Sequence, residues 1–314
     1  MPFSQDTPRR RKRRFVYLKR EIDDLVRGVC GGFLFGIPML YTMEVWWIGS
    51  SVTPPRLLGV LLITLLGTYL LSRTAGFRKA RAAKEREAIA DAVEAIALGL
   101  ICATLMLIVL RQITLETRLS EALGKAVFES VPFTLGVALS NQLFQDVDQS
   151  KESDAGSDED KEVLTQSPSL SNRSKRFFPE GNLNETVADI GATTIGSVII
   201  AFSIAPTDEV TGLVAAVHGP WLVLMVLISL VVSYGIVFQA NFSRQGQRRL
   251  QKGLFQSPLS ETIFSYLLSL IAAALMLSFF RKIDPSAPLE IAFRQILILG
   301  LPATIGGAAG RLTL

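Results

Sequence analysis

Carboxylates inside apolar segments are the residues of this sequence best suited to chemistry. The stretch "GGFLFGIPMLYTMEVWWIG", from Gly31 to Gly49, carries a single acid, Glu44. A charge inside a membrane segment is costly, and such residues often mark an ion pathway. Trp46 and Trp47 follow closely, where an aromatic belt is expected. We therefore expect Glu44 near the outer edge of a span and not at the midplane.

A second carboxylate occupies a matching position. When the second half of the chain is aligned with the first, "YTMEV" (Tyr41 to Val45) falls on "PTDEV" (Pro206 to Val210), which pairs Glu44 with Glu209. Two readings stay open for this outer pair. The acids are either ordinary interfacial carboxylates or symmetry-related carboxylates that flank an outer mouth, where rings of acids favour cations.

Glu129 lies deeper, in the segment "GKAVFESVPFTLG". We expect it to face the bundle interior, paired with Arg111 or Lys125, or with backbone that Pro132 frees. Pro132 and Pro302 stand at equivalent places and are expected to break or kink their helices. Broken helices that line a cavity are one way to build a midplane site; a kink that serves packing is the alternative.

The remaining candidate acids form an expected cytoplasmic layer near the beginnings of odd-numbered spans. They are Asp24, Asp91, Glu94, Asp189 and Glu261. A carboxylate near a helix N-terminus interacts favourably with the helix dipole, which is a sufficient structural reason for any one of them. The dipole does not explain why Asp24 matches Asp189 and Asp91 matches Glu261 in the repeat, so we retain all five as ion-pathway candidates.

Enzyme motifs are missing from the sequence. His218 is the one histidine, and no P-loop, GxSxG or CxxC motif occurs. Cys30 and Cys102 both lie in apolar runs, which is typical of packing residues. We therefore expect no enzyme, no cofactor and no metal site.

The candidate acids stand in apolar runs about 20 residues long, the length that crosses a bilayer. In a membrane such runs form helices, so the sequence predicts an all-α polytopic bundle of eight spans in a lipid bilayer. The expected ranges are 27–49, 55–73, 88–110, 122–142, 187–205, 219–240, 259–280 and 291–310.

Basic residues predict the orientation. The segments 9–14, 78–86 and 244–252 are rich in Lys and Arg, and eight spans place all three on one side of the membrane. The positive-inside rule therefore puts both termini in the cytoplasm. Arg9 to Arg14 are expected to lie on anionic lipid. We expect no nucleic acid as a partner, because no folded reader domain accompanies this tail.

The two halves of the chain resemble one another. Beyond the second cytoplasmic loop, the offset in residue number between matched positions of the two halves becomes slightly larger. With this larger offset, "ATLMLIVLRQI" (103–113) falls on "AALMLSFFRKI" (273–283). Four spans in each half predict two parallel repeats related by a pseudo-twofold axis along the membrane normal. The expected domains are a basic cytoplasmic tail (1–23), a first repeat (24–144), a disordered acidic cytoplasmic linker (145–186) and a second repeat (187–314).

This layout, with "GGFLFGIPMLYTMEVWW" early in the chain, resembles an uncharacterised family of bacterial integral membrane proteins that has no assigned activity. The resemblance implies a bacterial inner-membrane location and no mechanism. From the paired acids and prolines we expect an ion channel or transporter for cations or protons. The alternative is a non-transporting scaffold or sensor that binds a cytoplasmic partner through its tail and linker.

Overall fold

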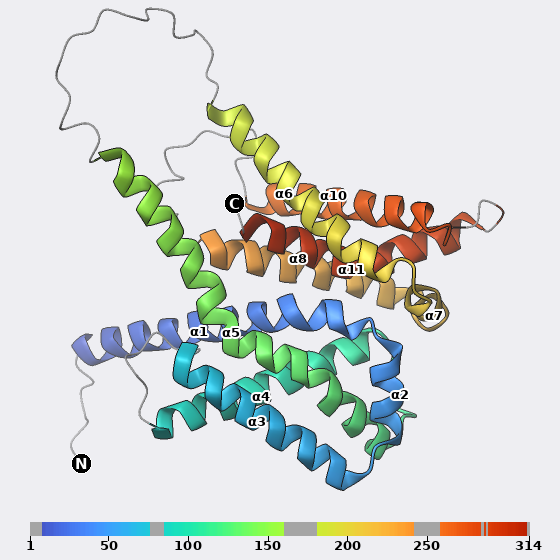
Figure 1. Ribbon diagram of the computed structural model, residues 1–314, viewed down its shortest axis with the longest axis horizontal. Coiled ribbons are helices and arrows are strands. Elements are labelled where there is room, and N and C mark those ends of the chain that lie inside the picture. The colour runs from blue at the N-terminus through green and yellow to red at the C-terminus, as the bar shows by residue number, and fades with distance from the viewer. Residues whose placement is uncertain are drawn as a thin grey trace, which may run out of the picture. The chain divides into compact units, whose positions relative to one another are not determined.

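All regular structure in the described part of the chain is helical. The computed structural model describes residues 8–75, 85–159, 181–241, 258–283, 286 and 288–312. Its helices, labelled in Figure 1, are α1 (Pro8–Leu40), α2 (Met43–Ser51), α3 (Pro54–Ala75), α4 (Glu85–Val109), α5 (Leu119–Glu159), α6 (Gly181–Ile204), α7 (Glu209–Ala216), α8 (Pro220–Asn241), α10 (Pro258–Phe279) and α11 (Leu289–Leu312).

Seven of these helices are long and apolar enough to cross a membrane, namely α3, α4, α5, α6, α8, α10 and α11. The number becomes eight if α1 and α2 together form one bent span. Each of the seven covers one of the predicted ranges to within one residue, because each is an uninterrupted apolar run of membrane-spanning length. The prediction of a polytopic helical membrane bundle is confirmed.

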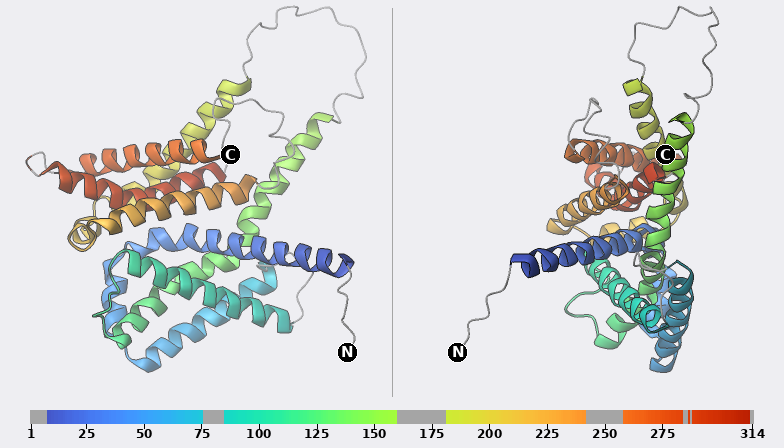
Figure 2. Two further views of the ribbon diagram at one scale, coloured as in Figure 1. Left: turned by 180° about the vertical axis from the view of Figure 1, so that it is seen from behind. Right: turned by 90° about the vertical axis from the view of Figure 1, so that its left-hand side faces the viewer.

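The first predicted span, 27–49, is not one straight helix. α1 ends at Leu40, α2 begins at Met43, and their axes differ by 91°; Figures 1 and 2 show the short α2 turning sharply from the end of α1. Pro38 inside α1 removes a backbone donor close to this break. α2 then buries Trp46 and Gly49, a gain that a straight continuation would forgo.

The segments predicted to be cytoplasmic also differ from expectation. α5 continues to Glu159, so residues 145–159 are helical and the predicted disorder is wrong for them. Extending an existing helix costs little once its first turn has formed. The basic residues Arg9 to Arg14 lie in the first turns of α1. Residues 160–180 of the linker and the basic segment 244–252 lie outside the described residues, as does most of 78–86.

The chain divides into two compact units. Unit 1 comprises Met1–Gly36, Val45–Leu105 and Arg118–Asn141; unit 2 comprises Ile37–Glu44, Met106–Thr117 and Gln142–Leu314. The main parts of the two units follow the predicted halves of the chain. The short segments Ile37–Glu44 and Met106–Thr117 nevertheless group with unit 2. The parallel relation between two repeats stays a prediction.

In unit 1, α1 and α5 touch backbone to backbone. A Cβ added to Gly31 would lie 2.5 Å from the carbonyl oxygen of Gly136, and a Cβ on Gly136 would lie 2.2 Å from that of Gly31. Further along α1, Gly36 leaves room for the buried ring of Phe133, which also meets Phe33 edge-on with ring centres 5.9 Å apart. Small residues allow this close approach.

Unit 2 repeats that contact with other residues. α11 packs against α6, α7, α8 and α10, and its crossing with α6 is made by two glycines. A Cβ on Gly196 would lie 2.1 Å from the carbonyl oxygen of Gly306, and a Cβ on Gly306 would lie 2.4 Å from that of Gly196. The glycine contact fixes how α11 sits against α6.

Two arginines end their helices in the left-handed conformation. Arg111 has a φ of 60° and Arg281 a φ of 55°, and they are the non-glycine residues with positive φ in the described part of the chain. After Arg111, the N–H of Gln112 donates to the carbonyl of Leu107 at 2.8 Å, and the same type of bond closes α10. Such bonds satisfy carbonyls that a helix end leaves open.

We predict that Gly136→Ala lowers the thermal stability of the detergent-solubilised protein by about 1–3 kcal/mol, because overpacking forces the backbones apart. Gly59→Ala is the matched control, since nothing lies within 4 Å of a Cβ at that position. Thermal unfolding followed by size-exclusion chromatography measures both variants. Equal melting temperatures would show that the α1–α5 contact does not limit stability.

Candidate functional site

Glu129 is an almost fully buried acid within a membrane span. It lies nearly three turns after the start of α5 at Leu119, which corresponds to about 15 Å of helix, and 1% of it is exposed. Its side chain interacts with that of Trp46. Neither Glu129 Oε1 nor Trp46 Nε1 has a partner in good hydrogen-bond geometry. The acid is therefore buried beside an indole whose N–H has no other acceptor.

The register of α5 explains this position. Glu129, Phe133, Gly136 and Ser140 recur at alternating spacings of four and three, so they share one helix face. Phe133 and Gly136 meet α1, and one turn before Phe133 this face reaches α2. Gly49 of α2 anchors that contact, since its Cβ would lie 2.9 Å from the Cα of Lys125. The bend before α2 thus brings Trp46 to Glu129.

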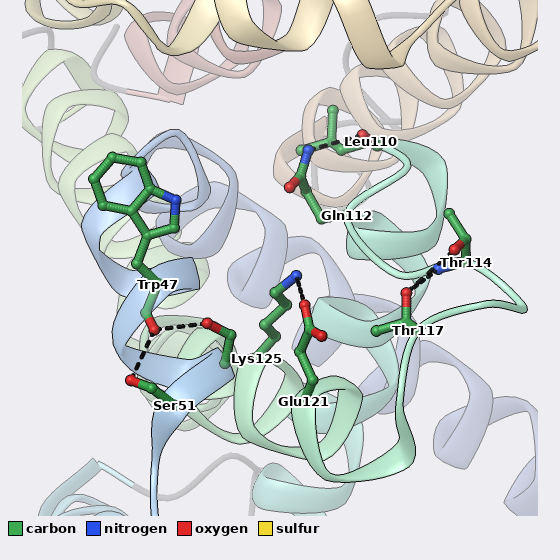
Figure 3. Close-up of polar contacts among 9 residues, drawn as sticks. Trp47, Ser51, Leu110, Gln112, Thr114, Thr117, Glu121 and Lys125 are labelled. Carbon is green, nitrogen blue, oxygen red and sulfur yellow. Dashed lines mark hydrogen bonds and ion pairs between the residues drawn. The ribbon is translucent and has the colours of Figure 1, made fainter.

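The predicted pairing of Glu129 with Lys125 is wrong, and its pairing with Arg111, which belongs to the other unit, stays a prediction. Lys125 Nζ donates to Glu121 Oε1 at 2.6 Å, as Figure 3 shows. The guanidinium of Arg111 lies over the ring of Trp221, 5.2 Å from its centre. Each cation has an interaction close to its own helix end, and neither has to reach the buried carboxyl.

The two helix prolines do not break their helices. α5 runs through Pro132 and α11 through Pro302 as single elements, so the predicted breaks are wrong, and a kink stays a prediction. Because proline has no N–H, Pro302 leaves the carbonyl of Ile298 without its helical donor. The hydroxyl of Tyr41 donates to this carbonyl at 2.7 Å, within unit 2.

α5 carries further buried side-chain oxygens after Glu129. Thr134 and Ser140 are both 0% exposed, and their hydroxyl oxygens have no hydrogen-bond partner. Thr134 packs against Gly99 of α4, where an added Cβ would lie 2.1 Å from its hydroxyl. On α4, Asp91 is buried and Glu94 is half-buried. Unit 1 therefore holds several polar atoms in its interior.

In unit 2 an arginine brings two predicted acids together. Arg311 of α11 is 5% exposed in its side chain, forms an ion pair with Glu261 of α10 and lies 3.5 Å from Asp189 of α6. It also donates to the hydroxyl of Ser265 at 2.9 Å. Sequence reasoning missed Arg311, although a basic residue in the last turn of a helix is a recognisable signal.

Unit 1 pairs its equivalent acid differently. Asp24 forms an ion pair with Arg27 on the next turn of α1. Because α1 begins at Pro8 and ends at Leu40, Asp24 lies in the middle of the helix, and the helix-dipole explanation is wrong for it. In the aligned halves Ala192 takes the place of Arg27, and Asn141 takes the place of Arg311. The arginine that pairs with the matched acid therefore lies on α1 in unit 1 and on α11 in unit 2.

The outer acids differ in their burial. Glu44, in the first turn of α2, is exposed, whereas Glu209 at the start of α7 is 9% exposed and its Oε2 has no hydrogen-bond partner. Beside it, Lys282 Nζ donates to Asp208 at 2.8 Å and lowers the pKa of that carboxyl. A mouth flanked by Glu44 and Glu209 stays a prediction, now with two acids of unequal burial.

No group of three or more His, Cys, Asp or Glu residues that could hold a metal ion occurs in the described residues. The groups available for chemistry are therefore carboxyls that do not form such a metal-binding group. Among them, Glu129 stands apart because a hydrogen-bond donor faces it and no ion pair to another described residue compensates its charge. Such a group can gain and lose a proton.

We predict that Arg311→Gln destabilises the protein by about 1–3 kcal/mol, because it removes a charge-assisted hydrogen bond to Glu261 and an ion pair with Asp189. Arg294→Gln on the same helix is the control, since Arg294 pairs one turn away with Glu290, a side chain that is 70% exposed. Thermal unfolding in detergent compares the two variants. A loss as large in Arg294→Gln would contradict a special role for the Arg311 contacts.

Comparisons with known proteins identify the family. A search of curated proteins and a search of solved structures each found no match. A family model described as "Putative integral membrane protein (DUF2391)" matches residues 24–314, which include every membrane-spanning helix described above. The sequence-based resemblance is confirmed, and the chain belongs to this family of integral membrane proteins.

Proposed function

We propose that this protein is an ion channel or transporter for cations or protons, and not an enzyme, in the inner membrane of a bacterium. The observation that carries the proposal is Glu129, a carboxyl that is 1% exposed within a span and has no ion pair with any residue that the structure describes. Ionisable residues at such depth are expensive, and those that persist in spans mark substrate and ion pathways.

Packing alone does not require an acid at this position. The residue that corresponds to Glu129 in the second half, at the spacing that also pairs Arg111 with Arg281, is Leu299. Leu299 is 0% exposed in α11. An apolar side chain therefore fills the equivalent position of a closely similar helix. This contrast supports a functional role for the carboxyl of Glu129.

We also propose that the chain is a duplication of a four-span unit. Three matched features support it. The left-handed residues Arg111 and Arg281 fall on one another in the aligned halves; a glycine contact joins the first and last long helix of each half; and a short helix, α2 or α7, follows the first long helix of each half. The sequence similarity at nearly constant spacing adds to these features.

The proposed orientation has both termini in the cytoplasm, with the basic tail on anionic lipid. It predicts which introduced cysteines a membrane-impermeant reagent labels in intact cells. A cysteine at Leu115, a fully exposed position between α4 and α5, should react with a membrane-impermeant maleimide in intact cells. A cysteine at Ser4 should react only after lysis. Replacing Cys30 and Cys102 removes background. Reaction of both sites in intact cells would contradict the proposed orientation of the first four spans.

Flux in proteoliposomes tests the proposed function. Purified protein should move at least one of H⁺, Na⁺, K⁺ and Ca²⁺ down an imposed gradient or voltage, and Glu129→Gln should reduce the rate at least tenfold. Glu121→Gln is the matched control, because Glu121 lies two turns away on the same helix and binds Lys125. If none of the four ions moves, the scaffold or sensor function becomes the better explanation.

The outer acids receive a separate flux test. Glu44→Gln combined with Glu209→Gln should change the rate or the ion selectivity if the two acids flank a mouth. Each single variant should show which acid matters, because only Glu209 is buried. Unchanged flux in the double variant would make both acids ordinary interfacial residues.

A further inference from the structure

We propose that Glu129 and Trp46 form a reversible proton-binding site, and that H⁺ is the ion this protein moves. The second part of this inference rests on the proposed transport function. The first part does not, because a carboxyl can bind and release a proton whether or not the proton then crosses the membrane. The contacts of the two side chains carry the argument.

The partner of the carboxyl is a donor. The indole of Trp46 can only donate a hydrogen bond; it is 4% exposed, and its N–H has no hydrogen-bond partner in good geometry, so it remains available to the carboxyl. A donor supports the charged carboxylate after a proton leaves, and the acid needs no rearrangement to bind the proton again. A metal cation at the same oxygen would instead face the positive end of the N–H dipole.

The surroundings do not suit a bare metal cation. Ca²⁺ takes six to eight oxygen ligands, and other hard cations likewise need several. No group of three or more His, Cys, Asp or Glu residues that could hold a metal ion occurs in the described residues. A proton needs a single carboxyl oxygen. The chemistry at Glu129 therefore fits H⁺ better than Na⁺, K⁺ or Ca²⁺.

Other titratable groups lie on the helices around Glu129. On its own helix Lys125 pairs with Glu121, and on α1 Asp24 pairs with Arg27. The remaining groups on these elements include Glu44, which is exposed on α2, Asp91 and Glu94 on α4, and the buried thiols Cys30 and Cys102.

The acids of α4 lie far from Glu129 along the helix axes. Gly99 of α4 meets Thr134 of α5. Asp91 lies more than two turns before Gly99, and Glu129 lies more than one turn before Thr134 on a helix that runs the opposite way. At 1.5 Å per residue the two carboxyls are about 20 Å apart along the axes. The side chain of Trp46 interacts with that of Glu129.

Infrared difference spectroscopy of the full chain in lipid nanodiscs tests the proton site directly. Acidification should produce the carbonyl band of a protonated carboxylic acid in an apolar surrounding. The band should disappear in Glu129→Gln and persist in Glu121→Gln. A band that persists in full in Glu129→Gln would overturn the proposal.

The indole is tested by Trp46→Phe, which keeps an aromatic ring and removes the N–H. Losing a donor that favours the carboxylate should move the midpoint of the band to higher pH by about one unit, a tenfold change in proton affinity. Trp47→Phe is the control, because Trp47 is 66% exposed. A folded Trp46→Phe protein with an unchanged midpoint would overturn the role of Trp46.

Flux then separates this inference from the proposed function. A pH-sensitive dye inside proteoliposomes should report proton movement that Glu129→Gln abolishes. Flux of Na⁺, K⁺ or Ca²⁺ that depends on Glu129 without proton movement would overturn H⁺ as the ion and leave the transport function in place. If no ion moves, the transport function and its ion both fail, while the infrared band still decides the proton site.

Discussion

Backbone contact between the first and last long helices of each unit is the constraint on which the rest of the structure depends. In lipid there is little hydrophobic force between helices, so close van der Waals packing has to hold them together. Gly31 with Gly136, and Gly196 with Gly306, let the backbones meet with no room for a Cβ atom. This contact fixes the register of α5 and α11, and so the depth of every polar group on them.

The two last helices share this packing and differ in their chemistry. α5 carries Glu129 two turns before Gly136, on the same face, whereas α11 has Leu299 at the equivalent position and Arg311 at its end. Arg311 joins α11 to α6 and α10 through carboxylates. Unit 2 thus uses a buried charge to tie helices together, and unit 1 keeps a buried acid beside a neutral donor.

Sequence reasoning located the spans well and the bend poorly. Seven predicted ranges match helices because apolar length is a local property. The apolar run from 27 to 49 gave no reason to expect a 91° bend, which becomes favourable only when α2 can bury Trp46 and Gly49. The polar composition of 145–159 predicted disorder, yet α5 extends through it because helix propagation costs little once begun.

The sequence by itself determined that this is a membrane protein, where its helical spans lie, and that Glu129 stands in an apolar helix. Composition and hydrophobic periodicity are local properties of the chain. The tertiary structure decided which groups meet. It placed Trp46 instead of Lys125 beside Glu129, left Glu44 exposed while burying Glu209, and paired Asp189 and Glu261 with Arg311. The physical reason is that a partner depends on which helix faces touch, and glycine contacts and one bend set those faces.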